Sequence, residues 1–297
     1  MIATVGYVPA VMFSSLADAV ERFSTVRALV IGDAIIDQYH FGRIDRISPE
    51  APVPVFVEDR SKVETRRGGA DNVAHQLEVL GCVVSKAYAL RRSVKHRYMV
   101  GHYQVFRIDS DSSERCDTNE FKTGERPDVI VLSDYAKGFL TDSLCRQVIE
   151  LALEERIPVV VDPKGSDWSK YRGCTVLCPN ESEYDKWNKE DRPDALLLKC
   201  GSKGMKVIDY ANGYDIDDCT EIPATARHVY DVTGAGDVVV ALVAAALGVG
   251  CDLRSAAHIA THAAGYVVGE VGTAVCPKET LFHLIAEAQY DAAVYHE

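Results

Sequence analysis

The segment Asp231-Val-Thr-Gly-Ala-Gly-Asp237 leads directly into an apolar run, Val238 to Leu247. Its three small residues, 234–236, predict the start of a buried helix, and the first backbone N–H groups of a helix have no partner inside it. Such groups form a binding site for an anion. A carboxylate in the same turn is stabilised in its ionised form and can take a proton from a neighbouring hydroxyl. The segment therefore predicts an anion-binding cradle with Asp237 beside it as a general base.

Taken alone, this segment leaves a simpler interpretation open. The small residues would then only let a helix begin close to a sheet, with Asp237 as a first-turn charge, because short glycine motifs recur by chance. Other signatures narrow the choice: the chain has no G-x-x-x-x-G-K-[ST] loop, H-R-D, G-x-G-x-x-G or H-E-x-x-H motif. P-loop ATPases, protein kinases, simple NAD-dependent dehydrogenases and zincin proteases are accordingly disfavoured.

Composition and charge are those of an ordinary soluble protein. The 297 residues are 47% hydrophobic and 26% charged, enough for one large or two modest domains. A formal net charge of −12 argues against a nucleic acid as partner. The longest apolar run, Ala235 to Val249, is too short for a membrane helix and contains Asp237. No membrane partner is therefore expected.

The cysteines predict a reducing compartment. None forms a C-x-x-C pair, and most stand singly in apolar runs, as buried thiols of a cytoplasmic protein do. The opening stretch, Met1 to Phe13, has no basic residue before Arg22 and is not expected to be a signal peptide. The nine cysteines are Cys82, Cys116, Cys145, Cys174, Cys178, Cys200, Cys219, Cys251 and Cys276.

Short runs rich in Val, Ile and Leu alternate with helical patterns, which is typical of a parallel sheet covered on both faces. Val73, Leu77 and Leu80 mark one predicted helix face, and Leu140, Leu144, Val148 and Leu151 mark another. The expected strands are Ala28 to Ile31, Val129 to Leu132, Ile157 to Val161, Thr175 to Leu177 and Ala195 to Leu198.

Polar residues follow these strands where each one ends. In doubly wound α/β folds a ligand lies outside the carboxyl ends of the strands, so we expect the active cleft at that edge. The strand exits are Gly32-Asp33, Ser133-Asp134, Asp162-Pro163-Lys164, Pro179-Asn180 and Lys199-Cys200-Gly201.

Two regions depart from this alternation of strand and helix patterns. Residues 38–59 and 94–109 show mixed polar and apolar alternation and predict a small sheet that stands over the cleft as a lid. Pro49, Pro52 and Pro54 confine the first region to edge or irregular strand. From Gly234 to about Ala288 the pattern is helical, with breaks at 248–250 and 272–277.

Several smaller motifs allow both a binding and a purely structural interpretation. Gly68-Gly69 with Asn72 permits close approach to a polyol, or is a glycine turn with a helix cap. Asp33 and Asp37 could grip sugar hydroxyls, or form a solvated turn. Asn180 and Glu183 could serve phosphate and Mg²⁺, or cap a helix. Gly201-Ser-Lys-Gly204 suits a nucleotide or a hairpin. His258 and His262, four residues apart without a third ligand, are expected to be helix-face histidines.

Taken jointly, Gly68-Gly69 with Asn72, Asn180-x-x-Glu183 and Asp231-x-Thr-Gly-Ala-Gly-Asp237 resemble the ribokinase-like (PfkB) carbohydrate kinases. Within that family the chain looks most like the kinases of D-glycero-β-D-manno-heptose 7-phosphate, and the likeness runs from about Leu16 to Leu284. The most specific segment is Ile44-Asp-Arg-Ile-Ser-Pro-Glu-Ala-Pro-Val-Pro-Val55. Further segments that carry the likeness are Leu132-Ser-Asp-Tyr-Ala-Lys-Gly138, Asp162-Pro-Lys-Gly165 and Tyr230-Asp231.

The resemblance implies a single domain over residues 1–297, with a three-layer, doubly wound, mostly parallel sheet and a β lid. It implies ATP and Mg²⁺ as cofactors, with a monovalent cation as a further candidate. An exposed lid sheet commonly pairs with another chain, so a homodimer joined through the lid is expected, in the cytoplasm that the cysteines indicate. The implied catalytic residues are Asp237 with the amides of Gly234, Ala235 and Gly236. The implied sugar-phosphate ligands are Asp33, Asp37, Gly68, Gly69, Asn72, Arg107 and Lys164. The implied nucleotide ligands are Asn180, Glu183, Lys199, Gly201, Gly204 and Thr233, with Glu183 reaching the metal through water.

The implied reaction is transfer of phosphate from ATP to the anomeric hydroxyl of the heptose 7-phosphate, which supplies ADP-heptose for surface polysaccharide. Two regions, 90–94 and 184–194, are shorter than in such kinases, so a narrower sheet is expected. A kinase of another sugar or sugar phosphate, and a non-catalytic sugar or nucleotide sensor, remain the alternatives. No nucleotidyltransferase activity is expected.

Overall fold

The computed structural model describes residues 13, 15–112, 125–189, 192–226, 228–270 and 274–294, and for 290–294 the backbone alone. Its main sheet has eight strands in the order β12-β11-β10-β9-β8-β7-β1-β4. Strands β10, β9, β8, β7, β1 and β4 pair in parallel, and β11 runs antiparallel to both of its neighbours, β10 and β12. The strands are β1 (Arg27–Gly32), β4 (Val83–Tyr88), β7 (Val129–Ser133), β8 (Val159–Asp162), β9 (Val176–Leu177), β10 (Ala195–Lys199), β11 (Met205–Asp209) and β12 (Thr220–Ile222).

Each of the five strands expected from the sequence is present, and both faces of the sheet are covered. Successive side chains of β7 go to opposite cores: Val129 and Val131 pack with α2, α5 and α6, whereas Ile130 and Leu132 pack with α3. Burial on both faces is why these strands are continuously apolar. The helices are α1 (Leu16–Glu21), α2 (Ala70–Val79), α3 (Asp142–Glu155), α4 (Glu181–Lys186), α5 (Ala235–Gly248), α6 (Leu253–Val267) and α7 (Lys278–Val294).

In the described part of the chain, short 3₁₀ turns lie at Arg22–Thr25, Ser169–Tyr171, Gly201–Lys203 and Ile216–Asp218. The C-terminal region is helical as expected, with α5 and α6 separated at 249–252. Gly272, part of the second expected break, lies outside the described residues, as do Cys116 and residues 1–12. Among the described residues no helix is long and apolar enough to cross a membrane.

The predicted buried face of α3 includes one residue that is not buried. The helix begins at Asp142, where the Thr141 hydroxyl accepts a hydrogen bond from the Leu144 amide, and Leu144 and Val148 are fully buried. Leu151 is 37% exposed, and Ala152 takes the buried position instead. Residues 144, 148 and 152 follow an i, i+4 row, whereas a side chain three residues after Val148 lies at the border of the face.

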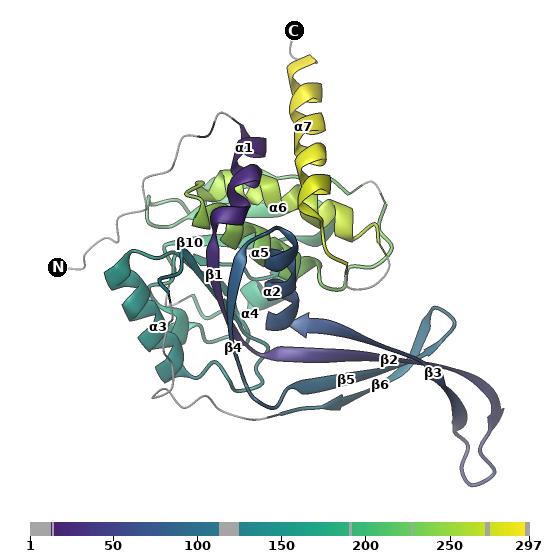
Figure 1. The fold of residues 1–297 in the computed structure, drawn as a ribbon. Helices are drawn as coiled ribbons and strands as arrows, with labels where there is room; N and C mark the ends of the chain where they lie inside the picture. Colours follow the sequence, from purple (N-terminus) through teal and green to yellow (C-terminus); the bar gives the residue numbers. More distant parts are fainter. Residues whose placement is uncertain are drawn as a thin grey trace.

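The lid is a second sheet with the order β3-β2-β5-β6, and it is larger than expected. Figure 1 shows it extending away from the main sheet as a long, twisted ribbon. Pro54 begins an edge strand, as the prolines predicted, but β2 lies inside the sheet, which corrects that expectation for residues 38–47. Pro49 and Pro52 fall in the bend between the two strands. The strands are β2 (Ala34–Ile47), β3 (Pro54–Gly69), β5 (Ser93–Val100) and β6 (Tyr103–Ser110).

Two aromatic rings pack beside the shortened region 184–194. Trp168 and Trp187 stack with ring centroids 4.8 Å apart, and both side chains are buried in the core on the α3 side of the sheet. Among the described residues between Lys186 and Ala195 there is no helix or strand. Burial of two indoles removes a large apolar area from water, so they cover strand residues such as Leu196 there.

The contrast within α3 yields a stability prediction. Leu144→Ala removes a fully buried side chain and should cost about 2–5 kcal/mol of unfolding free energy. Leu151→Ala, two turns further along the same helix, is the matched control and should cost less than about 1 kcal/mol. Urea denaturation followed by circular dichroism measures both. Equal losses would contradict the described orientation of α3.

Candidate active site

Asp237 lies in the first turn of α5, at the carboxyl edge of the main sheet. Gly234 caps this helix with a left-handed backbone (φ 82°), which favours glycine. The Ala235 amide donates to the Val232 carbonyl oxygen at 3.3 Å, so this predicted member of the anion cradle is already engaged in a turn. The amides of Gly236 and Asp237 have no acceptor within the helix because they belong to its first turn. Anion binding by the amides of 234–236 stays a prediction.

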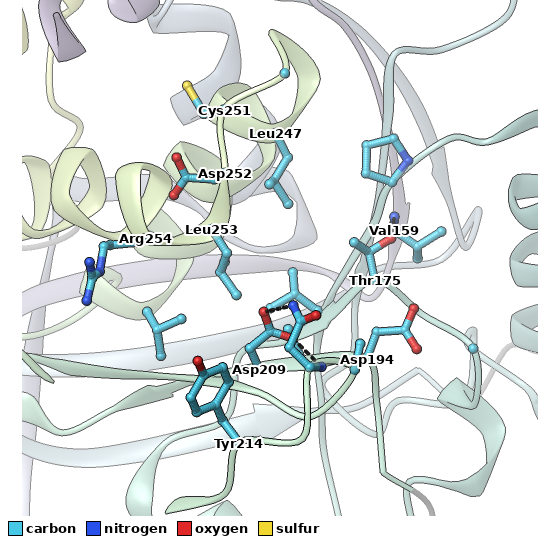
Figure 2. Close-up of a pocket in the computed structure, with 18 of the residues that line it drawn as sticks. Val159, Thr175, Asp194, Asp209, Tyr214, Leu247, Cys251, Asp252, Leu253 and Arg254 are labelled. Atoms are coloured by element: carbon cyan, nitrogen blue, oxygen red, sulfur yellow. Dashed lines mark hydrogen bonds between the residues drawn. The ribbon is translucent and has the colours of Figure 1, made fainter. Parts of the chain in front are cut away.

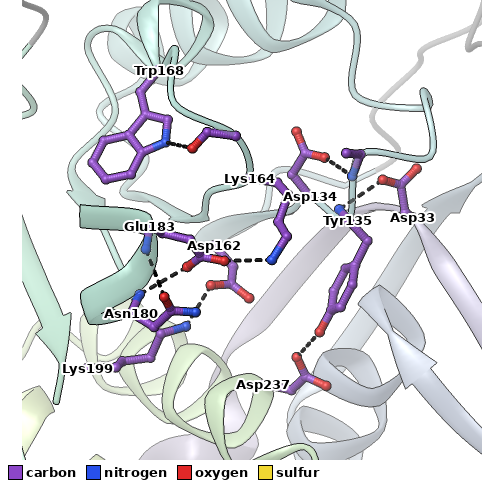
Figure 3. A network of polar contacts seen from close by, with 12 residues as sticks. Asp33, Asp134, Tyr135, Asp162, Lys164, Trp168, Asn180, Glu183, Lys199 and Asp237 are labelled. Carbon is purple, nitrogen blue, oxygen red and sulfur yellow. Dashed lines mark hydrogen bonds and ion pairs between the residues drawn. The ribbon is translucent and has the colours of Figure 1, made fainter. Parts of the chain in front are cut away.

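The Asp237 carboxylate is buried and held by two donors. Asn72, in the first turn of α2, donates from Nδ2 to Oδ2 at 2.7 Å, and the Tyr135 hydroxyl donates to Oδ1. Burial, with the nearby negative charge of Asp162 adding to it, raises the pKa of Asp237 to about 6, and the two hydrogen bonds oppose that rise. Figure 3 shows Tyr135 pointing at Asp237. A carboxylate with this pKa is ionised at neutral pH but accepts a proton readily.

Tyr135 is positioned by a loop that Asp33 organises. The Asp33 carboxylate accepts hydrogen bonds from the amides of Tyr135, Lys137 and Phe139, at 2.9, 3.0 and 3.2 Å. The preceding Gly32 lies against this loop, since a Cβ there would meet the Ser133 carbonyl oxygen at 2.1 Å. Asp33 was expected to hold sugar hydroxyls; the observed bonds give it a positioning role, and sugar contact stays a prediction.

Asp134 fixes the same loop from the other side. Its carboxylate accepts from the Lys170 ammonium and the Tyr171 hydroxyl at 2.5 Å each, and from the Ala136 amide at 2.6 Å. Sequence analysis quoted the segment around Asp134 and Tyr135 but assigned it no role. A tyrosine two residues after a strand could have drawn attention, but nothing in its spacing connects it to Asp237, 102 residues away.

A second group of charges lies at the ends of β8 and β10. The Lys199 ammonium donates to Asp162 at 2.7 Å, and a Cβ at Gly236 would lie 3.4 Å from that ammonium, so Lys199 is beside the first turn of α5. Burial disfavours the charge of Lys199, but Asp162, together with Cys178 and Glu183, raises the pKa overall. Lys199 therefore remains a cation next to Asp237. Figure 3 shows these groups around one edge.

Asn180 and Glu183 form the capping box that was their structural alternative. The Glu183 amide donates to Asn180 Oδ1 at 2.9 Å and the Asn180 amide to Glu183 Oε2 at 3.0 Å. The other Glu183 oxygen accepts from Lys164 at 2.7 Å. These contacts place all three predicted residues at the active edge, while their roles toward phosphate and Mg²⁺ stay predictions.

The lid brings further charged residues over this edge. Asp37 is buried, and its Oδ1 accepts from Arg97 Nε and Nη2 at 3.0 and 2.9 Å. Gly68 leaves room for this carboxylate, since a Cβ there would meet Asp37 Oδ2 at 2.3 Å. Lys95 lies 5.7 Å from the ring centre of Tyr135, so the same lid face reaches the group that holds Asp237. Sequence reasoning missed Lys95 and Arg97.

Several other residues predicted to bind ligands also have a structural reason for their identity. Gly204 passes close to β12, where a Cβ would meet the Ile222 carbonyl oxygen at 2.1 Å, whereas Gly201 has open space around it. Gly69 has φ 59°, and a Cβ there would meet the Asp33 carbonyl oxygen at 2.3 Å. The Thr233 amide donates to Asp231 at 2.9 Å. Their contacts with ligands stay predictions.

Arg107 lies on β6, opposite Arg97 in register, and pairs with Asp109 at 2.7 Å. It belongs to the lid, whereas Lys164, the other predicted phosphate ligand, follows β8. No group of three or more His, Cys, Asp or Glu that could hold a metal is found among the described residues. His258 and His262 lie on α6, where burial lowers the pKa of each.

A family model for the pfkB carbohydrate kinases matches residues 100–281. The chain belongs to this family and is a carbohydrate kinase. Curated relatives include the bifunctional protein HldE of Geobacter sulfurreducens, 38% identical over 305 residues, which are 86% of this chain and 62% of that protein. HldE of Syntrophotalea carbinolica is 35% identical over 338 residues, 95% and 68% of the two chains. The chain thus spans about two thirds of the length of these relatives.

Solved structures show the same fold. Ribokinase of Arabidopsis thaliana, in complex with ribose and ATP, aligns with a TM-score of 0.67 at 18% identity, over 88% of this chain and 98% of the other. Ribokinase of Thermotoga maritima aligns with a TM-score of 0.67 at 16% identity, over 88% and 99%. The fold is ribokinase-like, which confirms the architecture expected from the sequence.

The hydrogen bond from Tyr135 gives a prediction about the base. The bond lowers the pKa of Asp237, so Tyr135→Phe should raise that pKa above about 6. Carbon-13 NMR of the aspartate carboxyl signals, titrated from pH 4 to 8, follows the change without any assay of turnover. Tyr214→Phe, at an exposed tyrosine, is the control and should leave the titration unchanged. A lower or unaltered pKa in Tyr135→Phe would contradict the described contact.

Proposed function

We propose that this chain transfers the γ-phosphate of ATP to the anomeric hydroxyl of D-glycero-β-D-manno-heptose 7-phosphate. The product is the 1,7-bisphosphate, a precursor of ADP-heptose for surface polysaccharide. One observation carries the catalytic part: a buried carboxylate with a pKa of about 6 sits in the first turn of α5, held by Asn72 and Tyr135. The identity of 35–38% to HldE proteins supports the choice of sugar.

In the proposed reaction the anomeric oxygen attacks the γ-phosphorus and its proton passes to Asp237. The bond from that phosphorus to the bridging oxygen of ATP breaks, and ADP leaves with the bonding electrons. The free amides at the start of α5, together with Lys199, stabilise the negative charge on the migrating phosphoryl group. Asn72 and Tyr135 keep Asp237 oriented toward the hydroxyl.

The residues present fit a nucleotide–metal complex in which the protein supplies few metal ligands. Mg²⁺ commonly keeps several waters and binds through nucleotide phosphates with one or two carboxylates. Glu183 has an oxygen paired with Lys164 at 2.7 Å and could exchange that partner for metal-bound water. Bound Mg²⁺ would neutralise charge on the phosphates of ATP. Asn180, Lys199, Gly201, Gly204 and Thr233 are the proposed nucleotide contacts, and a monovalent cation is a further candidate cofactor.

The lid face above Tyr135 is suited to the phosphate that the substrate already carries. Lys95 and Arg97 lie two residues apart on β5, and Arg107 lies directly opposite Arg97 on β6. All three side chains therefore project from the same face of the lid. Burial lowers the pKa of Lys95. A dianion bound beside it would raise that pKa again. We place the 7-phosphate here, with Lys164 on the opposite side of the cleft and Asp33, Asp37, Gly68 and Gly69 near the sugar.

The other face of the lid supports the proposed homodimer. Tyr98 and Phe106 stack at 4.3 Å, with Phe56 edge-on to both, and Phe106 is 42% exposed beside the half-exposed Ile108. Strand β6 is an edge strand, and such edges pair with other chains unless they are covered. A cytoplasmic homodimer joined through this face, without nucleic acid or membrane, completes the proposal. A non-catalytic sensor is disfavoured because it needs no base at position 237.

The role of Asp237 is tested by Asp237→Asn. Turnover should fall by about 10²–10⁴-fold because a positioned base is lost, while ATP binding measured by calorimetry persists. In the wild type, kcat/KM should rise with pH through about 6 and then level off, because only the ionised carboxylate accepts the proton. Phosphorus NMR of the product from ATP and the heptose 7-phosphate reports reaction and position together. Near-normal turnover in the variant rules out the assignment.

The place of the substrate phosphate is tested on the lid. Arg107→Gln should raise KM for the sugar phosphate by about 10- to 100-fold, as expected for a lost charge-assisted hydrogen bond, and leave KM for ATP unchanged. Arg43→Gln is a matched control because Arg43 also pairs with an aspartate two residues later on a lid strand. Equal effects of the two substitutions would remove Arg107 from the phosphate site.

A further inference from the structure

A cavity of about 570 Å³ lies at the amino edge of the main sheet, at the opposite ends of the strands from Asp237. It is lined where β8, β9 and β10 begin and where the antiparallel β11 ends, at Val159, Val176, Ala195 and Asp209. The end of α3, the end of α5 and the start of α6 complete its wall. Figure 2 shows this cavity from close by. None of the residues assigned above to sugar, nucleotide or catalysis lines it.

The cavity combines an apolar wall with an acidic one. Leu153, Leu247 and Leu253 line it from the ends of three different helices. Asp194, the residue before β10, and Asp209, the last residue of β11, line it as well, and Figure 2 shows the Asp194 carboxylate directed away from Asp209. A volume of this size holds a small organic molecule, and pockets that do so commonly pair apolar walls with a few polar groups.

Asp194 is half-buried, and its charge has little compensation. Burial, followed by the negative charge of Asp209, raises the pKa of Asp194. Among the described residues no cationic side chain forms an ion pair with it. The cation nearest in sequence, Arg192, pairs with Asp215 at 3.1 Å, and Arg254 donates to the Thr220 hydroxyl at 3.0 Å. Asp194 therefore presents a half-buried carboxylate without a described ion pair to the cavity, an arrangement that a bound cation would stabilise.

The helix ends around the cavity favour positive charge as well. Both α3 and α5 are 14 residues long and direct their C-termini at it, so each presents partial negative charge. The start of α6 has the opposite sign, but Asp252 caps it by accepting from the Ser255 amide at 2.9 Å. Arg156, at the end of α3, is the remaining cation of the wall and its side chain is exposed. The lining contains four aspartates and two arginines.

We propose that this cavity is a second ligand site, distinct from the kinase site, that binds a small organic cation carrying an ammonium group. The ammonium donates to the Asp194 carboxylate, and the negative charge of Asp209 adds to the attraction. The alkyl part packs against Leu153, Leu247 and Leu253. Asp209 is preorganised for this role, because Asn212 donates to both of its oxygens from the backbone and the side chain, at 3.2 and 2.7 Å.

The test uses putrescine as the probe and the whole chain without ATP or sugar, so that its outcome does not depend on the proposed kinase reaction. Calorimetry at low ionic strength should show saturable binding of one putrescine per chain. The isosteric 1,4-butanediol, which lacks the charge, should not bind. No saturable putrescine binding at millimolar concentration, or equal binding of the diol, overturns the proposal.

Two substitutions locate the site. Asp194→Asn removes the half-buried carboxylate, whose side chain has no described hydrogen bond to lose, and should weaken putrescine binding by about tenfold or more. Asp217→Asn makes the same change in net charge at an exposed residue outside the lining and should leave binding unaltered. Thermal unfolding of both variants checks that each is folded. Equal weakening in the two variants would show that only overall charge attracts the diamine and would overturn the proposal.

Discussion

The active edge of this protein depends on one buried carboxylate. Asp237 sits at the start of a helix whose dipole favours its negative charge, yet burial and Asp162 raise its pKa to about 6. Asn72 and Tyr135 balance these effects through two hydrogen bonds. The two donors come from different segments of the chain. Asn72 lies on α2, which follows strand β3 of the lid, and Tyr135 lies in the loop after β7. The surrounding loops are arranged so that these donors meet one side chain.

Around Asp237 lie further buried aspartates, and each of them has a hydrogen-bond or ion-pair partner. Asp33 and Asp134 hold the loop that carries Tyr135, Asp162 holds Lys199 beside α5, and Asp37 holds Arg97 on the lid. Buried charges are stable only when they are paired or hydrogen-bonded. The strand exits of an α/β sheet supply the required backbone amides and cations at a single edge. Asp237, the proposed base, and the carboxylates that hold loops are therefore stabilised in the same way, by hydrogen bonds and neighbouring cations.

The two ends of the strands have different chemistry. The carboxyl edge combines acids with lysines and the start of α5, as transfer of a phosphoryl group between anions requires. The amino edge has a cavity with a half-buried acid that lacks a cation among the described residues, beside the C-termini of two helices. Helix α5 reaches both edges, and its 14 residues are almost entirely buried between the sheet and α6.

The sequence by itself determined the sheet strands, the glycine-led α5 with Asp237, the presence of a lid and the family, because apolar runs, glycines and short motifs act locally or in a fixed order. It placed Leu151 in the core and β2 at an edge, which was wrong, and it missed Tyr135, Lys95 and Arg97. It also missed the hydrogen bonds of Asp33 and Asn72 within the protein, whose contact with the sugar stays a prediction. Only the tertiary structure decided these points. Hydrogen bonds between residues more than 100 positions apart, such as Tyr135 to Asp237, depend on how loops and sheets meet, and no local pattern records that geometry.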